Sequence, residues 1–241
     1  FGWSKKDISC EGPIGIPWQF HERISKGLYD EITLTALAID NGKTVSIMVS
    51  ADLAILSDGI IFDIRSAVAK KNPWIPAENI VMNATHTHSS SATWKIADKS
   101  PDGRDVYSGD KYRDFATNQI ADAVCEAWET RKEGGIAYGY GYAVVAHSRR
   151  TIYSEDQGGA DVNAAPNGFG VMYGSTKKAS FSHYEAGADH FLNAMFTVDE
   201  TGKMTGVIVN VVLVVLGACN EGTADILTKA VNICTECVGL G

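Results

Sequence analysis

The stretch NIVMNATHTHSSS, residues 79–91, decides the fold and places the chemistry. Its apolar first part, residues 79–83, is typical of a buried strand, and His86 and His88 follow directly. α/β folds collect functional side chains at the carboxyl ends of their strands, so this order predicts a site there. On extended backbone, side chains two positions apart point to the same side, so both imidazoles would face one space.

The histidine pair has two possible uses. One imidazole could hold a metal ion while the other faces the substrate, or both could do the same task. The plain alternative is a polar loop with two solvated histidines, which an isolated pair would favour. Small hydroxyl residues surround the pair and favour a packed polar site: Thr85, Thr87, Ser89, Ser90 and Ser91.

Upstream of this stretch, the sequence predicts a hairpin and a helix. Residues 31–39 and 44–50 have strand character, and the turn signal at residues 40–43 separates them. Ser57 and Asp58 are expected to cap a helix that runs to about Lys71.

Downstream, a surface loop over residues 95–108 precedes a predicted helix from Asp110 to about Lys132, with an apolar stripe that includes Phe115. Residues 157–182 have no periodicity, which in a compact domain favours a functional segment. The remaining predicted elements are strands at residues 136–145, 151–153, 190–198 and 204–216, and a helix at residues 224–235. We therefore predict an α/β fold, a mixed β-sheet flanked by helices, with residues 1–241 as a single domain.

Composition limits the classes of function. The chain has 241 residues and a net charge of −8, with an isoelectric point near 5.2. That balance argues against binding to nucleic acid or to an anionic membrane, because both call for a basic surface. The longest apolar run, residues 207–216, is interrupted by Asn210 and is shorter than the roughly 20 residues of a transmembrane segment. We interpret it as a buried strand.

The five cysteines are odd in number and irregularly spaced, so they predict no disulfide framework. Cys234 and Cys237 have the spacing of a metal or redox pair, but no companion motif accompanies them, which favours two partly buried thiols. The chain starts without a methionine. We expect a processed, secreted or periplasmic protein whose signal peptide has been removed.

Two further groups of polar residues are candidates near the histidines. Asp52 follows a predicted buried strand, where it could bind a metal, orient a histidine or cap a backbone turn, and the cap is the favoured alternative. His21 and Arg23 lie in a proline-containing loop. A guanidinium at the mouth of a site can fix a carboxylate or polarise a carbonyl, although a surface ion pair is the simpler interpretation.

Charged residues of the second half give two more candidates. Arg149 and Arg150 are adjacent on a predicted strand, so at most one enters a pocket, and a solvated edge is the default interpretation. His183 and His190 bracket two carboxylates. A metal or acid–base cluster and a hydrogen-bonded loop network are equally consistent with them.

Several of these segments together resemble the neutral/alkaline, non-lysosomal ceramidase-like family. The resemblance runs in order from residue 1 to about residue 225. The segments that carry the resemblance are WSKKDIS (3–9), QFHERISKGLYD (19–30), VSADL (49–53), NATHTHS (83–89), AHSRR (146–150), MYGST (172–176) and FSHYE (181–185). The last two segments resemble a bacterial branch of ceramidase-like hydrolases.

The resemblance implies a zinc-dependent hydrolase of an N-acyl amide bond. It assigns His86 to zinc, His88 to the substrate as acid/base or oxyanion partner, and Arg149 to the wall of the substrate site. Zinc lowers the pKa of its bound water and polarises a carbonyl, which suits amide hydrolysis. The expected substrate is a small-molecule or lipid amide. His21, Arg23 and His183 are further candidates for binding it.

This sequence departs from the family at the second zinc-binding histidine. Leu213 stands at that place, in the strand that precedes Thr223-Ala224-Asp225. The family's remaining ligands, a glutamate and a tyrosine, lie beyond this length, so the resemblance implies the N-terminal part of a longer hydrolase. Asp52 and Asp225 would be supporting groups. The alternative is a metal-free or degenerate ligand-binding domain that keeps the fold without catalysis. The sequence predicts no oligomeric state.

Overall fold

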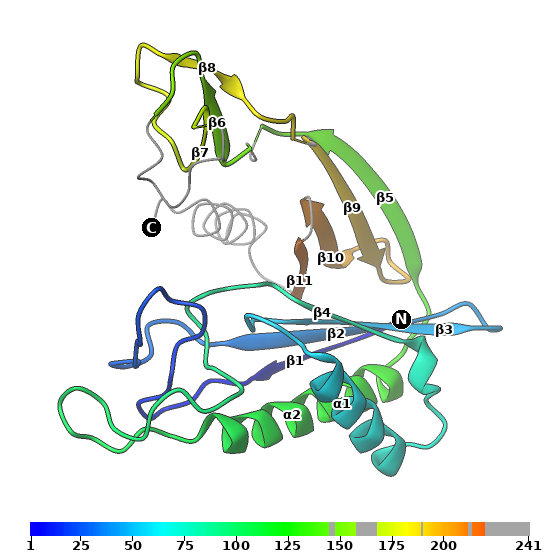
Figure 1. Cartoon of the computed structure of the whole chain (residues 1–241). Helices are drawn as coiled ribbons and strands as arrows, with labels where there is room; N and C mark the ends of the chain where they lie inside the picture. Colours follow the sequence, from blue (N-terminus) through cyan, green and yellow to red (C-terminus); the bar gives the residue numbers. More distant parts are fainter. Residues whose placement is uncertain (145–147, 158–167, 189, 212–213, 220–241) are drawn as a thin grey trace.

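The computed structural model describes residues 1–144, 148–157, 168–188, 190–211 and 214–219. These residues form three β-sheets and two α-helices (Figure 1). Within this described part, no helix has the length and apolar character needed to cross a membrane.

The first sheet is mixed, as the sequence predicts. It consists of four strands in the order β1 (Gly2–Asp7), β2 (Thr33–Asp40), β3 (Val45–Ala51) and β4 (Ile80–Ala84). β1, β2 and β3 pair antiparallel, whereas β3 and β4 are parallel. The predicted hairpin turn between β2 and β3 is present. There the Asn41 Oδ1 accepts hydrogen bonds of 2.9 Å from the backbone N–H groups of Lys43 and Thr44.

Two helices cover one face of this sheet (Figure 1). The helix α1 (Asp58–Lys71) and the short 3₁₀ turn η1 (Ala77–Asn79) form the crossover that parallel pairing of β3 and β4 requires. The bounds of α1 agree with the predicted helix. The helix α2 (Gly109–Glu129) ends three residues before the predicted Lys132.

The core lies between the helices and the sheet. Ile64 and Val68 of α1 and Ile120 of α2 are fully buried in it. The prediction for α2 is wrong in one respect, because Phe115 is 37% exposed and Tyr112 is buried instead. Tyr112 and Ile120 lie two turns apart on one face of the helix, and Phe115 lies at the edge of that face.

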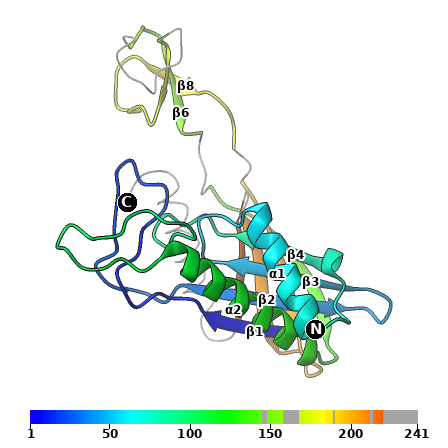
Figure 2. The ribbon, with the colours of Figure 1, turned by 60° about the horizontal axis from the view of Figure 1, so that its bottom comes forward.

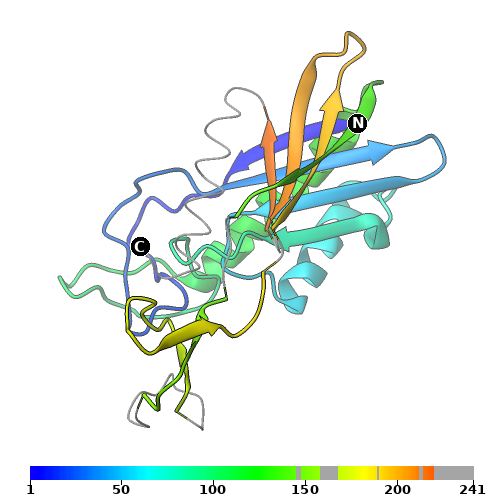
Figure 3. The same ribbon diagram turned by 90° about the horizontal axis from the view of Figure 1, so that it is seen from above.

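The second sheet is antiparallel and runs across the first (Figure 3). Its strands, in spatial order, are β11 (Val214–Cys219), β10 (Met204–Val211), β9 (Phe191–Val198) and β5 (Gly135–Tyr142). β11 contacts β2 and β3, and the Trp3 Nε1 donates to the Thr197 Oγ1 at 2.9 Å. These contacts attach the second sheet to the first.

The single strand predicted for residues 204–216 is wrong. The run forms two antiparallel strands, β10 and β11, in which Val211 pairs with Val214. Every residue from 211 to 216 is apolar and suited to a strand, and no turn residue marks the reversal. The pattern therefore predicts strand conformation correctly and misses the change of direction.

A small third sheet contains β7 (Gly170–Met172), β6 (Arg150–Tyr153) and β8 (Phe181–Tyr184), in that order. Figure 2 shows β6 and β8 projecting well away from the first sheet and its helices. The aperiodic segment 157–182 contains β7 and the start of β8. The predicted helix at residues 224–235, with Leu213, Asp225, Cys234 and Cys237, lies outside the described residues.

Candidate functional site

The histidine pair lies at the carboxyl end of β4, where the chain leaves the parallel pair. β4 ends at Ala84, and the backbone N–H groups of Thr85 and His86 then donate to the carbonyls of Ala51 and Leu53, at 2.9 and 3.0 Å. His86 has a positive φ of 63°. The expectation of extended backbone through both histidines is therefore wrong at His86, where the chain turns after its last contact with the segment that follows β3.

The two imidazoles nevertheless face each other. Their Nε2 atoms are 3.4 Å apart, and the ring centroids are 4.9 Å apart in an edge-on arrangement. The Nδ1 of His86 lies 2.8 Å from the carbonyl oxygen of Ala54. Because a carbonyl only accepts hydrogen bonds, Nδ1 carries a proton, which leaves Nε2 as the acceptor nitrogen of the neutral His86 ring.

This arrangement fits part of a metal site. Two nitrogens bound to one tetrahedral zinc are about 3.3 Å apart, given Zn–N distances of about 2.0–2.1 Å. The Nε2 separation of 3.4 Å matches that spacing, and a backbone carbonyl on the other ring nitrogen is the usual support of a ligating histidine. Among the residues that the structure describes, no group of three or more His, Cys, Asp and Glu side chains could hold a metal ion.

Two tryptophans adjoin the pair, and the sequence analysis missed both. The Trp18 ring centroid lies 4.9 Å from that of His86 and 5.7 Å from that of His88. Trp94 lies 6.4 Å from Trp18. The neighbouring Gln19 donates from Nε2 to the His88 carbonyl at 2.8 Å. The only sequence signal was the placement of Gln19 in the proline-containing loop that holds His21.

The Asp52 carboxylate is hydrogen-bonded to Thr33. Its Oδ2 accepts from the Thr33 hydroxyl at 2.9 Å and from the Thr33 N–H at 3.4 Å. These bonds reach the start of the neighbouring strand β2 rather than a local turn, and the His86 ring is oriented by the Ala54 carbonyl. Asp52 still lies one residue beyond β3, close in sequence to that carbonyl.

For the other predicted site residues, the structure shows no hydrogen bond, ion pair or ring contact with the histidine pair among the described residues. His21 and Arg23 are exposed, on the loop that brings Trp18 and Gln19 to the pair. Arg149 and His183 belong to the third sheet region, which Figure 2 shows projecting away from β4. Asp225 lies outside the described residues.

The adjacent arginines have different partners, but only Arg150 belongs to β6, and Arg149 lies just before that strand. The Arg149 Nη1 donates to the Tyr173 hydroxyl at 3.2 Å. Arg150 forms an ion pair with Glu185, with its Nε 3.1 Å from Oε2. His183 contacts the Ser182 hydroxyl through Nδ1 at 2.9 Å.

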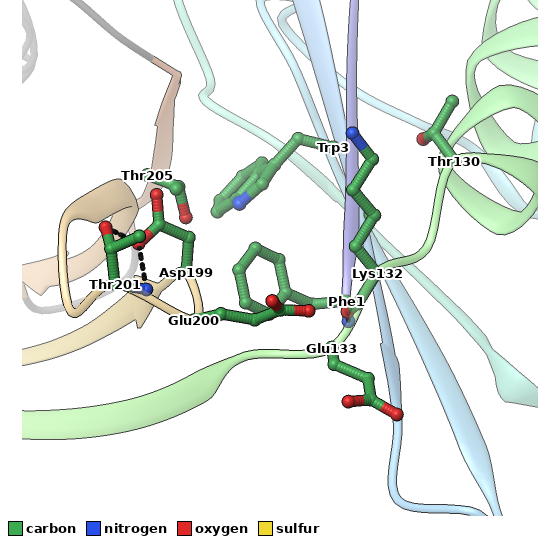
Figure 4. A pocket seen from close by; sticks show the side chains of 10 residues that line it. Phe1, Trp3, Thr130, Lys132, Glu133, Asp199, Glu200, Thr201 and Thr205 are labelled. Carbon is green, nitrogen blue, oxygen red and sulfur yellow. Dashed lines mark hydrogen bonds between the residues drawn. The ribbon is translucent and has the colours of Figure 1, made fainter.

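A hollow of about 520 Å³ lies elsewhere, between the start of β1 and the β9–β10 turn (Figure 4). Trp3, Lys132 and Glu200 are among its lining residues, and neither histidine lines it. Asp199 is committed to the turn, because the Thr201 hydroxyl and the Lys203 N–H bond its carboxylate and lower its pKa. The histidine pair therefore remains the better candidate for chemistry.

Ceramidases are among the solved structures with a similar fold. The chain is similar to a neutral ceramidase from Pseudomonas aeruginosa and to a ceramidase complexed with C2. Each match has a TM-score of 0.60 and 19% sequence identity, and covers 86% of this chain. The chain spans only 30% of the length of either ceramidase. No protein-family model matches the sequence, and no curated protein matches it. At this identity the likeness concerns the fold, and the chain has a ceramidase-like fold.

Proposed function

We propose that this chain carries part of the active site of a zinc-dependent hydrolase that cleaves an N-acyl amide bond. The observation that carries the proposal is the approach of the His86 and His88 Nε2 atoms to 3.4 Å. The Ala54 carbonyl supports it by fixing the protonated nitrogen of His86. The ceramidase-like fold supports the choice of an amide, from a lipid or a small molecule.

In this proposal the two histidines have different tasks. His86 binds zinc through Nε2, and zinc when bound supplies an activated water and a polarised carbonyl. His88 holds or transfers a proton beside it, or stabilises the oxyanion. The Gln19 bond to the His88 carbonyl fixes the backbone that carries this ring.

The remaining candidates have supporting tasks. His21 and Arg23 would bind substrate from the loop over the histidines, and Asp52 and Asp225 would support the site. Arg149 and His183 would reach the substrate only if the third sheet closes towards β4 (Figure 2). We further propose that the protein is secreted or periplasmic.

Zinc analysis of the purified chain tests the proposal. We expect the chain to bind zinc, with binding retained by His88→Ala and lost by His86→Ala, because His86 supplies the ligand that this part of the site contributes. His183→Ala, on the exposed strand β8, is the matched control and should keep its zinc. Amide hydrolysis should be lost in both His86→Ala and His88→Ala.

Other outcomes change the proposal in defined ways. Loss of zinc in His88→Ala as well would make both histidines ligands. A chain that binds no zinc at micromolar supply would contradict the proposal. The alternative would then apply, a ligand-binding domain that keeps the fold without catalysis.

A further inference from the structure

Trp18 lies against the histidine pair but is not buried there. Its ring approaches both imidazoles, with centroid distances of 4.9 and 5.7 Å, yet 44% of the residue is exposed. One part of the indole therefore contacts the two rings while another part is open to solvent. A large aromatic side chain in such a place is available to a ligand bound at the histidines.

The backbone holds Trp18 in an unfavourable conformation. Its φ is +54°, a left-handed value that bulky residues rarely adopt. Burial does not explain this conformation, because nearly half of the residue is exposed. The surrounding loop must supply the constraint.

The constraint comes from bonds between this loop and the segment after the histidines. The Gln19 Nε2 donates to the His88 carbonyl at 2.8 Å. The Ala92 N–H donates to the Gly15 carbonyl at 2.8 Å, and the Tyr107 N–H donates to the Pro13 carbonyl at 2.7 Å. With bonds on both sides of it, the backbone at Trp18 is held beside the pair.

The two indoles provide an apolar surface in a surrounding without charged residues. Trp94 extends it, with its ring centroid 6.4 Å from that of Trp18. Residues 12–20 and 84–94 contain no Asp, Glu, Lys or Arg. A charged group on the substrate would find no opposite charge on these two segments, whereas an apolar group could lie against the indoles.

We infer that Trp18 is a specificity-determining residue whose exposed indole binds the apolar group next to the bond on which the histidines act. The inference rests on the proposed function and adds a residue that neither the family resemblance nor the sequence analysis assigns. Trp18 recognises the substrate, and the histidines carry out the chemistry.

The test compares two amides that differ only in acyl length, N-acetylethanolamine and N-octanoylethanolamine. For Trp18→Ala we expect kcat/KM to fall about tenfold for the octanoyl amide and to stay within about twofold for the acetyl amide. Trp18→Phe should restore most of the preference, because it keeps a flat apolar ring. Trp74→Ala, an 81% exposed tryptophan before β4 and so at the opposite end of that strand, is the matched control.

Two further measurements separate this inference from the proposed function. Zinc content should be the same in Trp18→Ala and in the parent protein, and a loss of zinc would overturn the inference by giving Trp18 a structural task. Tryptophan fluorescence tests binding without catalysis. N-octanoylethanolamine should change the emission of the parent protein more than that of Trp18→Phe.

If the parent protein binds no zinc and cleaves neither amide, the proposed function fails, and the fluorescence difference still decides whether Trp18 binds the acyl chain. Equal fluorescence responses in the parent protein and Trp18→Phe would overturn the inference. So would an unchanged acyl preference in an active Trp18→Ala.

Discussion

The first sheet and the second sheet differ in the exposure of their large side chains. The first sheet and its helices bury a continuous set of aliphatic side chains, with Ile64, Ile80 and Ile120 fully inaccessible. In the second sheet, Tyr138 and Tyr140 of β5 are 80% and 69% exposed. One layer is stabilised by burial, and the other by strand pairing and by ring contacts on its surface.

The local sequences explain this contrast. The helices α1 and α2 repeat apolar residues at helical spacing, so each presents one face to the sheet. β5 instead alternates small and large residues, with Ala137 and Gly139 on one face and the tyrosines on the other. Its rings find partners across the strand pair, and Tyr140 stacks on Phe191 at 5.0 Å. The contrast predicts that mutations of similar size will have very different effects in the two sheets.

Truncation of a core side chain should have the largest effect. Ile64→Ala removes a fully buried side chain from between α1 and the sheet. We expect the free energy of unfolding to fall by about 2–5 kcal/mol, because the lost burial and the remaining cavity both destabilise. Chemical denaturation would measure this loss, provided that the dependence of the free energy of unfolding on denaturant concentration has the same slope in both proteins.

The matched change in the second sheet is Tyr140→Ala, which removes a larger but mostly exposed ring. We expect a loss below about 1 kcal/mol, the size of a cross-strand pair. Equal losses for Ile64→Ala and Tyr140→Ala would contradict the contrast between the sheets. They would mean that the second sheet is covered in solution.

A single buried hydroxyl should have an intermediate effect. The Tyr112 hydroxyl donates to the Ile8 carbonyl at 2.8 Å. Burial raises the pKa of this hydroxyl above its usual value, so it remains a donor. We expect Tyr112→Phe to lower the free energy of unfolding by about 1–2 kcal/mol, since it leaves a buried carbonyl without this partner. Tyr138→Phe, at an exposed tyrosine of β5, should change it by less than about 0.5 kcal/mol. A loss as large in Tyr138→Phe would show that the exposed ring is bonded in solution.

The order of residues along the chain was enough to predict where the histidines lie. The apolar run before His86 predicts a buried strand, and the helix α1 before that run makes β4 parallel to β3. The approach of the two rings was also predicted, but for a reason that does not hold, since the backbone at His86 is turned rather than extended. Arg149 and Arg150 have different partners, but strand alternation does not explain the difference, because Arg149 lies outside β6.

Contacts between loops could not be predicted in the same way. Trp18 reaches His86 because the loop before β2 is bonded to the segment after β4, and neither segment has a periodic pattern. Similarly, the carbonyl of Ala54 orients His86 although no side chain reveals it. Local patterns predict elements, whereas these contacts depend on how two irregular segments meet.

The smallest expected effect concerns acid stability at the edge of the first layer. Glu126 of α2 accepts a hydrogen bond of 2.9 Å from the Ser4 hydroxyl and pairs with Lys6, both on β1. The hydrogen bond from Lys6, followed by that from Ser4, lowers the pKa of this carboxyl below its ordinary value of 4.5. A depressed carboxyl pKa contributes stability that is present above the ordinary pKa and is lost as the pH falls through the folded-state pKa.

Glu126→Gln should therefore lower the free energy of unfolding by less than about 1 kcal/mol at pH 7, because the pair is partly exposed and screened by solvent. As the pH falls through the folded-state pKa of Glu126, the variant and the parent protein should approach each other in stability, since the carboxylate becomes protonated. Denaturation midpoints at several pH values would measure this convergence. Glu129→Gln, at the exposed last residue of the same helix, is the matched control. The difference in stability between this variant and the parent protein should change little with pH. A difference between Glu126→Gln and the parent that grew on acidification would contradict the assigned sign, and would show that β1 and α2 are joined by something other than this carboxylate.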